Sequence, residues 1–410
     1  MMNILFVHEV DWLEKVVFDI HFLAEGLSLL GHNIYAIDYE DTWGRKSILD
    51  LGTLKTTEVN SISRAFDGAT ISLRRPGFIR VPALSRMSAF FTHYREIKRT
   101  IREKSIDAII LYSVPTNGLQ TIRLARKYNI PVLFRSIDIL NMLVSNTLLR
   151  RITRLLEKRV YSRVDAVLPN TPQYYKYIAS MGIPESRIKL LPFPIDMELF
   201  RPIADVTETR QQWELAENEQ VIVFIGTLFD FSGLDDFIRQ FPRVIEQVPE
   251  AKLLIVGDGP QRAKLEQIIT ELGLDKKVTI TGFQPYQTMP QYINLAAVCI
   301  NTFVINDDTM DVFPAKIMQY VACGKPTVAT ALRGIMTLLP DESHGVVYAD
   351  NADGMATEVI SLLKSARCRK QIGEAGLKNI RQKYSHKEIA RELETILQEA
   401  IKEKRSGTGN

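Results

Sequence analysis

The chain has 410 residues, of which 46% are apolar and 24% charged. This is the composition of an ordinary globular protein, and the length suggests two or three domains. No stretch approaches the ~18 apolar residues of a membrane-spanning helix, and the opening "MMNILFVHEVD" lacks the basic leader of a signal peptide. Three cysteines form neither a CxxC pair nor zinc-ligand spacing, so we expect no metal site and a reducing, cytoplasmic compartment.

Positive charge is concentrated in the first half of the chain, although the formal net charge is only +3. Residues 51–190 hold 24 Lys and Arg against 9 Asp and Glu, a balance of +15, so the rest of the chain carries −12. A basic region of this size predicts an anionic partner, such as an anionic membrane surface. The sequence contains no nucleic-acid-binding module, so we expect no nucleic-acid partner.

Short apolar runs alternate with helical patterns along the first half. Strands are predicted at 3–7, 33–37, 107–111, 131–134, 165–168 and 188–191. Helices are predicted at 14–30, ending at Gly31, and at 117–128, 147–162 and 172–181. This alternation is typical of a parallel sheet covered on both faces by helices.

A proline-rich break, "PFPIDMELFRP" at 192–202, separates this series from a second one. The second series has predicted strands at 221–226, 251–257, 277–282, 297–301 and 326–330, and charged helices at about 351–404. The sequence therefore predicts an α/β protein with two Rossmann-like, doubly wound domains facing a cleft. Ligands bind such sheets at the carboxyl ends of the strands.

Two glycine turns follow strands of the second series. Gly226 ends "VFIG", and Gly257 opens "GDGP" before a helical segment. Either turn can be an ordinary strand–helix connection, or it can let a phosphate approach backbone amides. Ser232 and Asp235 form an S-x-x-D signature, which favours a helix cap at Ser232 rather than a catalytic role.

The segment "DVFPAKIMQYVACGKP", residues 311–326, predicts a helix that Pro314 starts and Gly324 caps at its C-terminus. Lys316 and Gln319 share one helical face, opposite a buried face. They can be a solvated surface, or they can serve an anion held by the free amides of the first turn.

The segment 146–164 predicts a basic amphipathic helix, with Leu148, Ile152, Leu155, Leu156 and Val160 on one face. It can be an ordinary surface helix or one that lies on anionic lipid. His8, at the end of the first strand, can point into a ligand-binding cleft.

Taken in order, "GHNIYAI", "VGDGP", "VTITGF", "PAKIMQYVACGKPTVAT" and "YSHKEIARELETIL" resemble family-four retaining glycosyltransferases over nearly the whole chain. The resemblance implies a GT-B fold, with an acceptor-side domain at 1–195 and a nucleotide-sugar-binding domain at 196–384. It also implies a helix at 385–404 that crosses back to the first domain, followed by a tail at 405–410.

Several positions depart from the family pattern. On the acceptor side, the family's Gly-Gly turn matches Asp11-Trp12 before Glu14, which implies a bulkier loop. The family's histidine matches Ile137, which leaves Asp138 and Arg135 as the nearby polar groups.

On the donor side, the family's Arg and Lys beside the diphosphate match Thr227 and Ser232, and its E-x7-E pair matches Asp311 and Gln319. Gln319 can bind ribose without charge. The resemblance assigns the diphosphate to Gly226, Lys316 and the amides near Ala315, sugar hydroxyls to Asp311, and the base to Gly282-Phe283.

The sequence therefore predicts transfer of a sugar from a nucleotide-sugar to an acceptor hydroxyl with retention, in glycan or surface polysaccharide biosynthesis. The nucleotide-sugar is a substrate, and no cofactor or metal is expected. A glycan or a lipid-linked molecule is the expected acceptor, and the inner face of a membrane is the expected site of action. Two alternatives stay open, a binding or regulatory protein that has lost turnover and a sugar-nucleotide epimerase.

Overall fold

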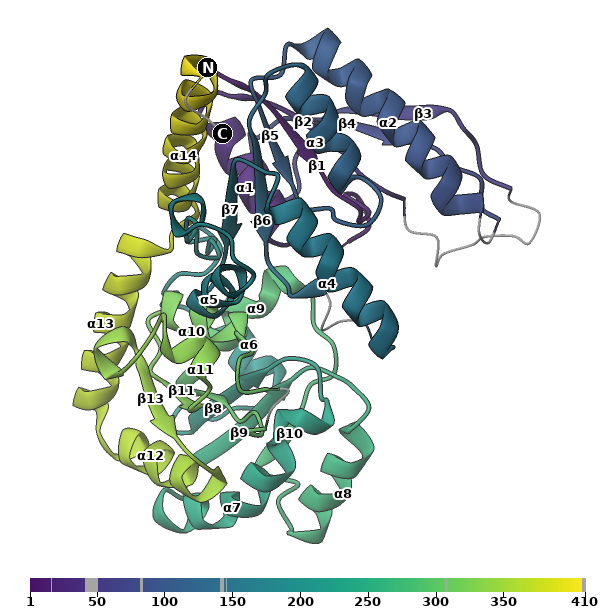
Figure 1. The fold of residues 1–410 in the computed structure, drawn as a ribbon. Coiled ribbons are helices and arrows are strands. Elements are labelled where there is room, and N and C mark those ends of the chain that lie inside the picture. The colour runs from purple at the N-terminus through teal and green to yellow at the C-terminus, as the bar shows by residue number, and fades with distance from the viewer. Residues whose placement is uncertain are drawn as a thin grey trace. The chain divides into compact units, whose positions relative to one another are not determined.

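The computed structural model describes residues 1–15, 17–40, 51–81, 84–140, 144, 146–306 and 309–407. The chain divides into two compact units (Figure 1), Met1–Pro194 together with His386–Asn410, and Ile195–Ser385. We call them the first and the second domain. The division falls at the start of the proline-rich break, and the chain returns to the first domain at His386.

The first domain contains a seven-stranded sheet in the order β3-β4-β2-β1-β5-β6-β7. Only β3 pairs in the antiparallel direction, with β4. The strands are β1 (Asn3–Val7), β2 (Asn33–Ile37), β3 (Thr56–Ile62), β4 (Ile71–Pro76), β5 (Ala108–Leu111), β6 (Val132–Ser136) and β7 (Ala166–Pro169).

Alternate residues of β1 face two separate cores, as expected for a sheet covered on both sides. Leu5 and Val7 pack in one core with residues from α2 to α5, and Ile4 and Phe6 pack in another with residues from α1 and α14. The helices are α1 (Asp19–Leu29), α2 (Leu84–Lys104), α3 (Gly118–Lys127), α4 (Thr147–Tyr161), α5 (Pro172–Ser180) and α14 (His386–Ser406).

The C-terminal helix α14 packs against α1 (Figure 1). Gly26 permits the close approach, because a Cβ atom at this position would lie 2.9 Å from Cβ of Ala390. Polar contacts fix the register of α14, including His32 to Glu394 at 2.9 Å and Lys404 to Asp165 at 2.7 Å.

The second domain has an all-parallel sheet in the order β10-β9-β8-β11-β12-β13. Its strands are β8 (Gln220–Ile225), β9 (Ala251–Val256), β10 (Val278–Ile280), β11 (Ala296–Asn301), β12 (Thr327–Thr330) and β13 (Val346–Ala349). Its helices are α6 (Thr207–Gln212), α7 (Leu234–Gln247), α8 (Arg262–Glu271), α9 (Met289–Leu295), α10 (Ala315–Ala322), α11 (Arg333–Met336), α12 (Ala352–Lys364) and α13 (Ala366–Lys383).

The predicted doubly wound α/β class is confirmed in each domain, with differences in detail. The predicted strand at 188–191 is wrong, because that segment forms only an isolated bridge between Ile188 and Val167. Strands β3, β4 and β13 were not predicted; β3 has no buried residue that would mark a pattern. The helix predicted to begin at residue 14 begins at Asp19, and it ends before Gly31, whose φ is +88°.

A buried ion pair joins α1 to β6 in the first domain. The Arg135 guanidinium donates to both carboxylate oxygens of Asp19, at 2.9 and 2.5 Å, and both residues are almost fully buried. Arg135 also donates to the carbonyl oxygens of Leu168 and Leu191, and the Tyr112 hydroxyl donates to Asp19 at 2.8 Å. The Arg135 guanidinium therefore connects the start of α1 to β6, to β7 and to the segment around Leu191.

We expect Arg135→Met to destabilise the first domain by about 3–5 kcal/mol, because it leaves the Asp19 carboxylate buried without its counter-charge. Urea unfolding measures the loss. The matched control is Lys189→Met, which removes a partly exposed pair with Glu399 and should cost at most about 1 kcal/mol. The double variant Asp19→Leu/Arg135→Met should recover much of the loss. Equal destabilisation by the single and double variants would contradict this account.

Candidate functional site

The strand order of the second domain places its ligand crevice beside β8. Strands β9 and β10 extend from one side of β8, and β11 to β13 extend from the other. The loops that leave β8 and β11 therefore diverge, and ligands of doubly wound sheets bind outside the carboxyl ends of the strands at such a switch point. These two loops begin near Gly226 and Thr302.

Lys316 of α10 reaches this switch point. Its Nζ lies 4.0 Å from the ring centroid of Phe224, in β8, and 4.8 Å from that of Phe303, which follows β11. A Cβ atom on Gly226 would lie only 2.6 Å from Nζ. Burial lowers the pKa of Lys316 to about 7. The structure thus brings together Gly226 and Lys316, two of the residues predicted to contact phosphate.

The Lys316 ammonium is stabilised by few groups of the protein itself. The two aromatic faces offer cation–π contacts, and no carboxylate pairs with it within the described ranges of the chain. An anion bound beside Gly226 would supply the missing negative charge and would raise the pKa of Lys316 again. The geometry therefore favours an anionic ligand at this point.

Three glycine turns line the carboxyl ends of β8, β9 and β10. Gly226 and Gly257 have φ of +145° and +151°, and a Cβ atom on Gly257 would lie 2.0 Å from the carbonyl oxygen of Gly226. Gly257 and Gly282 form an isolated antiparallel bridge. Three turns that are far apart in the sequence therefore lie next to one another, and each contributes a glycine without a side chain.

Gln319 lies one turn beyond Lys316 on α10, whose first turn contains the partly buried Ala315. Its Nε2 donates to the Tyr286 hydroxyl at 3.3 Å. Burial raises the pKa of Tyr286, so this phenol stays neutral. Sequence reasoning missed Tyr286, because nothing in "GFQPY" indicates that its hydroxyl meets a helix more than thirty residues further on.

Three other predicted donor-side residues lie on the surface. Thr227 is exposed, and Phe283 presents 82% of its area to solvent. The Asp311 carboxylate lies 3.1 Å from the Arg333 guanidinium, and both side chains are exposed. Sequence reasoning did not select Arg333, which lies in α11, after β12, and pairs with Asp311.

The prediction that Ser232 caps a helix is wrong. Helix α7 has Gly233 as its N-cap residue, with φ of +63° and no side-chain cap. Ser232 is buried, and its carbonyl oxygen accepts a hydrogen bond from the Thr302 hydroxyl. The hydrogen bond from the Thr302 side chain to the Ser232 carbonyl, rather than a side-chain cap, fixes this turn.

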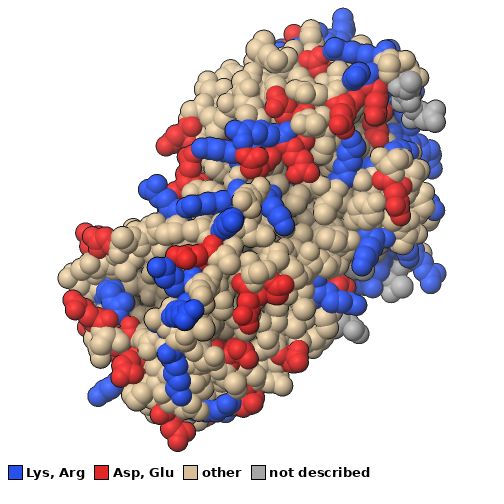
Figure 2. Space-filling model, turned by 90° about the vertical axis from the view of Figure 1, so that its left-hand side faces the viewer, with Lys and Arg blue, Asp and Glu red and all other residues tan. Residues whose placement is uncertain are grey.

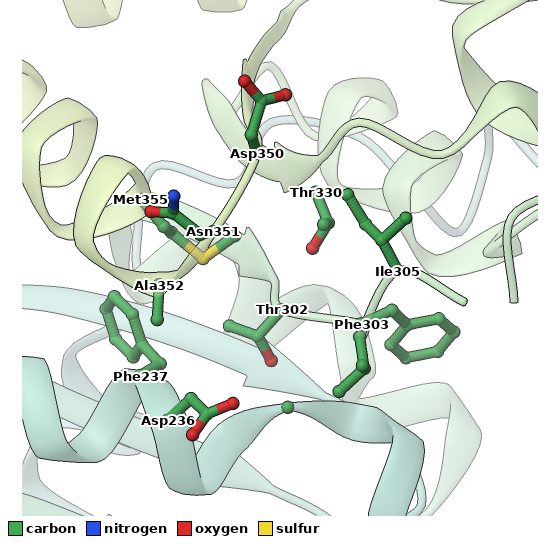
Figure 3. A pocket seen from close by; sticks show the side chains of 12 residues that line it. Asp236, Phe237, Thr302, Phe303, Ile305, Thr330, Asp350, Asn351, Ala352 and Met355 are labelled. Atoms are coloured by element: carbon green, nitrogen blue, oxygen red, sulfur yellow. The ribbon is translucent and has the colours of Figure 1, made fainter.

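A cavity of about 250 Å³ lies at the carboxyl ends of β11 to β13 (Figure 3). Asp236 and Asp350 stand on opposite sides of it, with Met355 and Phe237 on another wall. Phe303 lines this cavity and also faces Lys316, so the two features adjoin. None of the predicted site residues lines this cavity.

The first domain has a larger cavity, of about 420 Å³, at its own switch point between β1 and β5. It brings together three residues that the sequence selected, His8, Arg135 and Asp138. Further lining residues include Glu9, Lys15, Phe18, Tyr112, Ser113, Ser136 and Leu140.

Environment sets the charge of two groups in this cavity. Burial lowers the pKa of His8 to about 4, so the imidazole is neutral at pH 7. Its Nδ1 accepts from the Val10 amide at 2.9 Å, which assigns the ring proton to Nε2. Partial desolvation raises the pKa of Asp138 at the rim, and the negative charge of Asp19 adds to this effect. His8 can therefore donate a hydrogen bond from Nε2 to the oxygen of a bound hydroxyl.

Three acceptor-side predictions are corrected. Trp12 does not enlarge a loop, because its side chain is 1% exposed and packs in the core against Phe6 and His21. Glu14 is exposed and does not line the cavity. Arg135 lines the cavity wall, but its guanidinium is committed to Asp19 and to backbone carbonyls, which makes it a structural residue rather than a catalytic one.

In the described part of the chain, no helix is both long and apolar enough to cross a membrane. In the same residues, no group of three or more His, Cys, Asp or Glu is arranged as a metal site.

Comparison with known proteins adds family evidence. The family model "Glycosyl transferases group 1" matches residues 205–379, and the model "Glycosyl transferase 4-like domain" matches residues 21–194. The chain is 28% identical over 224 residues to an uncharacterized glycosyltransferase of Methanocaldococcus jannaschii, covering 53% of this chain and 55% of the relative.

A second relative is the GDP-mannose-dependent alpha-(1-6)-phosphatidylinositol monomannoside mannosyltransferase of Mycolicibacterium smegmatis, 28% identical over 229 residues, which are 55% of this chain and 60% of that protein. The matches thus span little more than half the length of these relatives.

Among solved structures, Anabaena HepE in complex with UDP superposes with a TM-score of 0.71 at 17% identity, covering 97% of this chain and all of HepE. This likeness concerns the fold. Together with the two family models, which account for both domains, it shows that the chain belongs to the family-four-like glycosyltransferases of the GT-B superfamily.

Proposed function

We propose that the protein transfers a sugar from a nucleotide-sugar to an acceptor hydroxyl with retention of configuration. The observation that carries the proposal is the Lys316 ammonium, held beside Gly226 at the switch point with no carboxylate partner among the described residues. The likeness to HepE, solved with UDP and with UDP-glucose, supports a donor of this class.

In the proposed reaction, the bond between C1 of the sugar and the diphosphate oxygen breaks, and the acceptor oxygen bonds to C1 on the same face. The acceptor proton passes to the leaving diphosphate, so no cofactor or metal is required. Lys316 and the amides near Ala315 stabilise the charge that develops on the leaving group. Gln319 binds ribose, Asp311 holds sugar hydroxyls, and Phe283 lies along the base.

The cavity around His8 is the proposed acceptor site. Neutral His8 and the rim carboxylate of Asp138 are suited to hold and orient a hydroxyl. We propose a glycan or lipid-linked acceptor, and action at the inner face of a membrane. Support comes from the M. smegmatis relative, whose name states a phosphatidylinositol mannoside substrate. The lapsed-enzyme and epimerase alternatives are not favoured, because the relatives that match are named as glycosyltransferases.

The direct test is incubation with UDP-, GDP- and ADP-sugars, followed by NMR of the products. Slow release of free sugar whose first-formed anomer matches that of the donor supports a retaining transferase. Conversion of the donor to its epimer, or binding without any turnover in the presence of candidate acceptors, contradicts the proposal.

Replacing Lys316 should weaken binding of the nucleoside diphosphate. We expect Lys316→Met to reduce affinity about 10- to 150-fold, the loss of one charge-assisted hydrogen bond worth roughly 1.5–3 kcal/mol. Methionine keeps the apolar contact with Phe224, so folding should be preserved. Calorimetry with UDP, or with the diphosphate of the active donor, measures the effect. Lys264→Met, which removes an exposed pair with Asp235, is the matched control. An unchanged affinity in folded Lys316→Met removes Lys316 from the mechanism.

Binding should also depend on pH through Lys316. In the free protein its pKa is about 7, and a bound diphosphate stabilises the charged form, so binding takes up a proton above this pH. Affinity should fall as pH rises from 7.5 to 9, by up to about tenfold per pH unit. Calorimetry in buffers of different ionisation enthalpy measures the proton uptake. Lys316→Met should abolish it, and uptake that persists in this variant assigns the proton to another group.

The Gln319→Glu variant tests whether Gln319 stands in for a ribose-binding carboxylate. The Tyr286 hydroxyl can rotate to donate to Glu, so the local hydrogen bond is kept. We expect donor affinity within about threefold of the parent protein, or higher, whereas Gln319→Ala should lose about tenfold, roughly one hydrogen bond. A tenfold loss in Gln319→Glu would show that the site lacks the positive charge that tolerates an acid at this position, because the new carboxylate then repels the diphosphate.

A further inference from the structure

Helix α4 carries an apolar stripe that faces solvent. Leu148, Ile152 and Leu155 follow i, i+4, i+7 spacing and are 68%, 45% and 68% exposed. The helix packs on its domain through another face, which contains the fully buried Val160. The sequence had grouped Val160 with these three residues on one face, and the structure corrects that grouping. The stripe is therefore apolar surface that the fold of this domain does not use.

Positive charge surrounds this stripe, and the one acidic residue of α4 is turned inward. Glu157 is buried and accepts hydrogen bonds from the Leu140 amide at 3.0 Å and the Tyr177 hydroxyl at 3.1 Å. The exposed side of the helix therefore offers an anionic partner no repulsion. The exposed basic residues are Arg150, Arg151, Arg154, Lys158 and Arg159.

Helix α2 repeats the arrangement. Leu84, Met87 and Phe91 follow i, i+3, i+7 spacing and are 46%, 60% and 67% exposed. The same stripe continues into basic residues, Arg95, Lys98 and Arg102. Each helix thus exposes an apolar stripe, with basic residues around the stripe in α4 and beyond it in α2.

The two apolar stripes lie at one end of the first domain. Helix α3 packs between α2 and α4 (Figure 1). Because α2 leads from β4 to β5 and α4 from β6 to β7, in a sheet where these strands are parallel, both helices begin at the carboxyl edge of the sheet. The His8 cavity opens at this same edge.

Charge of both signs is mixed on another side of the molecule. Figure 2 shows the side on which α14 lies, where Lys and Arg alternate with Asp and Glu. Apolar side chains beside an excess of positive charge are what the interface of an anionic bilayer binds, through burial of the apolar face and attraction to lipid headgroups.

We propose that α2 and α4 together form a docking surface for an anionic lipid bilayer, with the stripes Leu84–Met87–Phe91 and Leu148–Ile152–Leu155 inserted at the headgroup level. This proposal does not depend on the proposed donor site. One consequence rests on the proposed function: the surface holds the acceptor cavity next to the membrane, where a lipid-linked acceptor resides.

Co-sedimentation with vesicles tests the surface. The full chain should bind vesicles of phosphatidylglycerol and phosphatidylcholine at low salt, and should bind at least tenfold more weakly to phosphatidylcholine alone or at high salt. The variant Leu148→Ser/Ile152→Ser/Leu155→Ser should lose at least tenfold in affinity for the anionic vesicles. So should Arg151→Gln/Arg154→Gln/Lys158→Gln.

Two controls match these changes elsewhere. Leu29→Ser/Leu272→Ser removes exposed apolar residues outside both helices, and Arg367→Gln/Lys370→Gln/Lys378→Gln removes the same charge from α13. Both should bind vesicles as the parent does. Donor binding, measured by calorimetry without lipid, should be equal in all these variants, so failure of this inference and failure of the donor site are separable.

Insertion of the α4 stripe into the bilayer can be measured separately from binding. In a Cys368→Ser background, which leaves only the buried Cys299 and Cys323, an environment-sensitive dye on Leu148→Cys should shift to the blue when anionic vesicles are added. Equal binding to neutral vesicles, no loss in either stripe or charge variant, or an unshifted dye overturns the proposal. The proposal is also overturned if the parent protein is a dimer and the stripe variant is a monomer. In that case a second copy of the chain covers this face.

Discussion

Parallel strand pairing is the constraint on which both candidate sites depend. A parallel sheet brings the carboxyl ends of its strands to one edge, and a change in winding direction opens a crevice between two neighbouring strands. The crevice lies between β1 and β5 in the first domain, and between β8 and β11 in the second. The His8 cavity occupies the first position and the Lys316 ammonium the second.

The proposed donor site shows how one charge can be supplied from a different element. The loop after β8 holds Thr227 and Ser232 where the family places Arg and Lys, and Ser232 is buried in a backbone contact. Lys316 instead crosses from α10 to the end of β8, between two aromatic rings. Its lowered pKa reflects an ammonium that the protein alone solvates poorly, and this is the condition under which an incoming phosphate gains most from the contact.

In the proposed acceptor site, some polar groups are committed to contacts within the protein, and others can bind a ligand. Arg135 and Asp19 satisfy each other in the interior, so neither offers a hydrogen bond to a ligand. His8 and Asp138 keep unshared capacity at the wall and the rim, respectively. The cost of removing a polar group from water explains both outcomes. Arg135 and Asp19 are charged and buried, so each must find its partner within the protein. A group at the rim of the cavity can stay hydrated or exchange its water for a ligand.

The sequence by itself determined the fold class, most strands and the glycine turns at Gly226, Gly257 and Gly282, because apolar period and backbone freedom are local properties that a short segment carries. It also determined that Lys316 and Gln319 share a helical face. Only the tertiary structure decided what these residues meet: Lys316 against Phe224 and Gly226, the Trp12 side chain packed in a core, and the apolar side chains of α4 outward rather than inward. These outcomes depend on contacts between segments far apart in the chain, and periodicity specifies which residues share a face without specifying what lies opposite it.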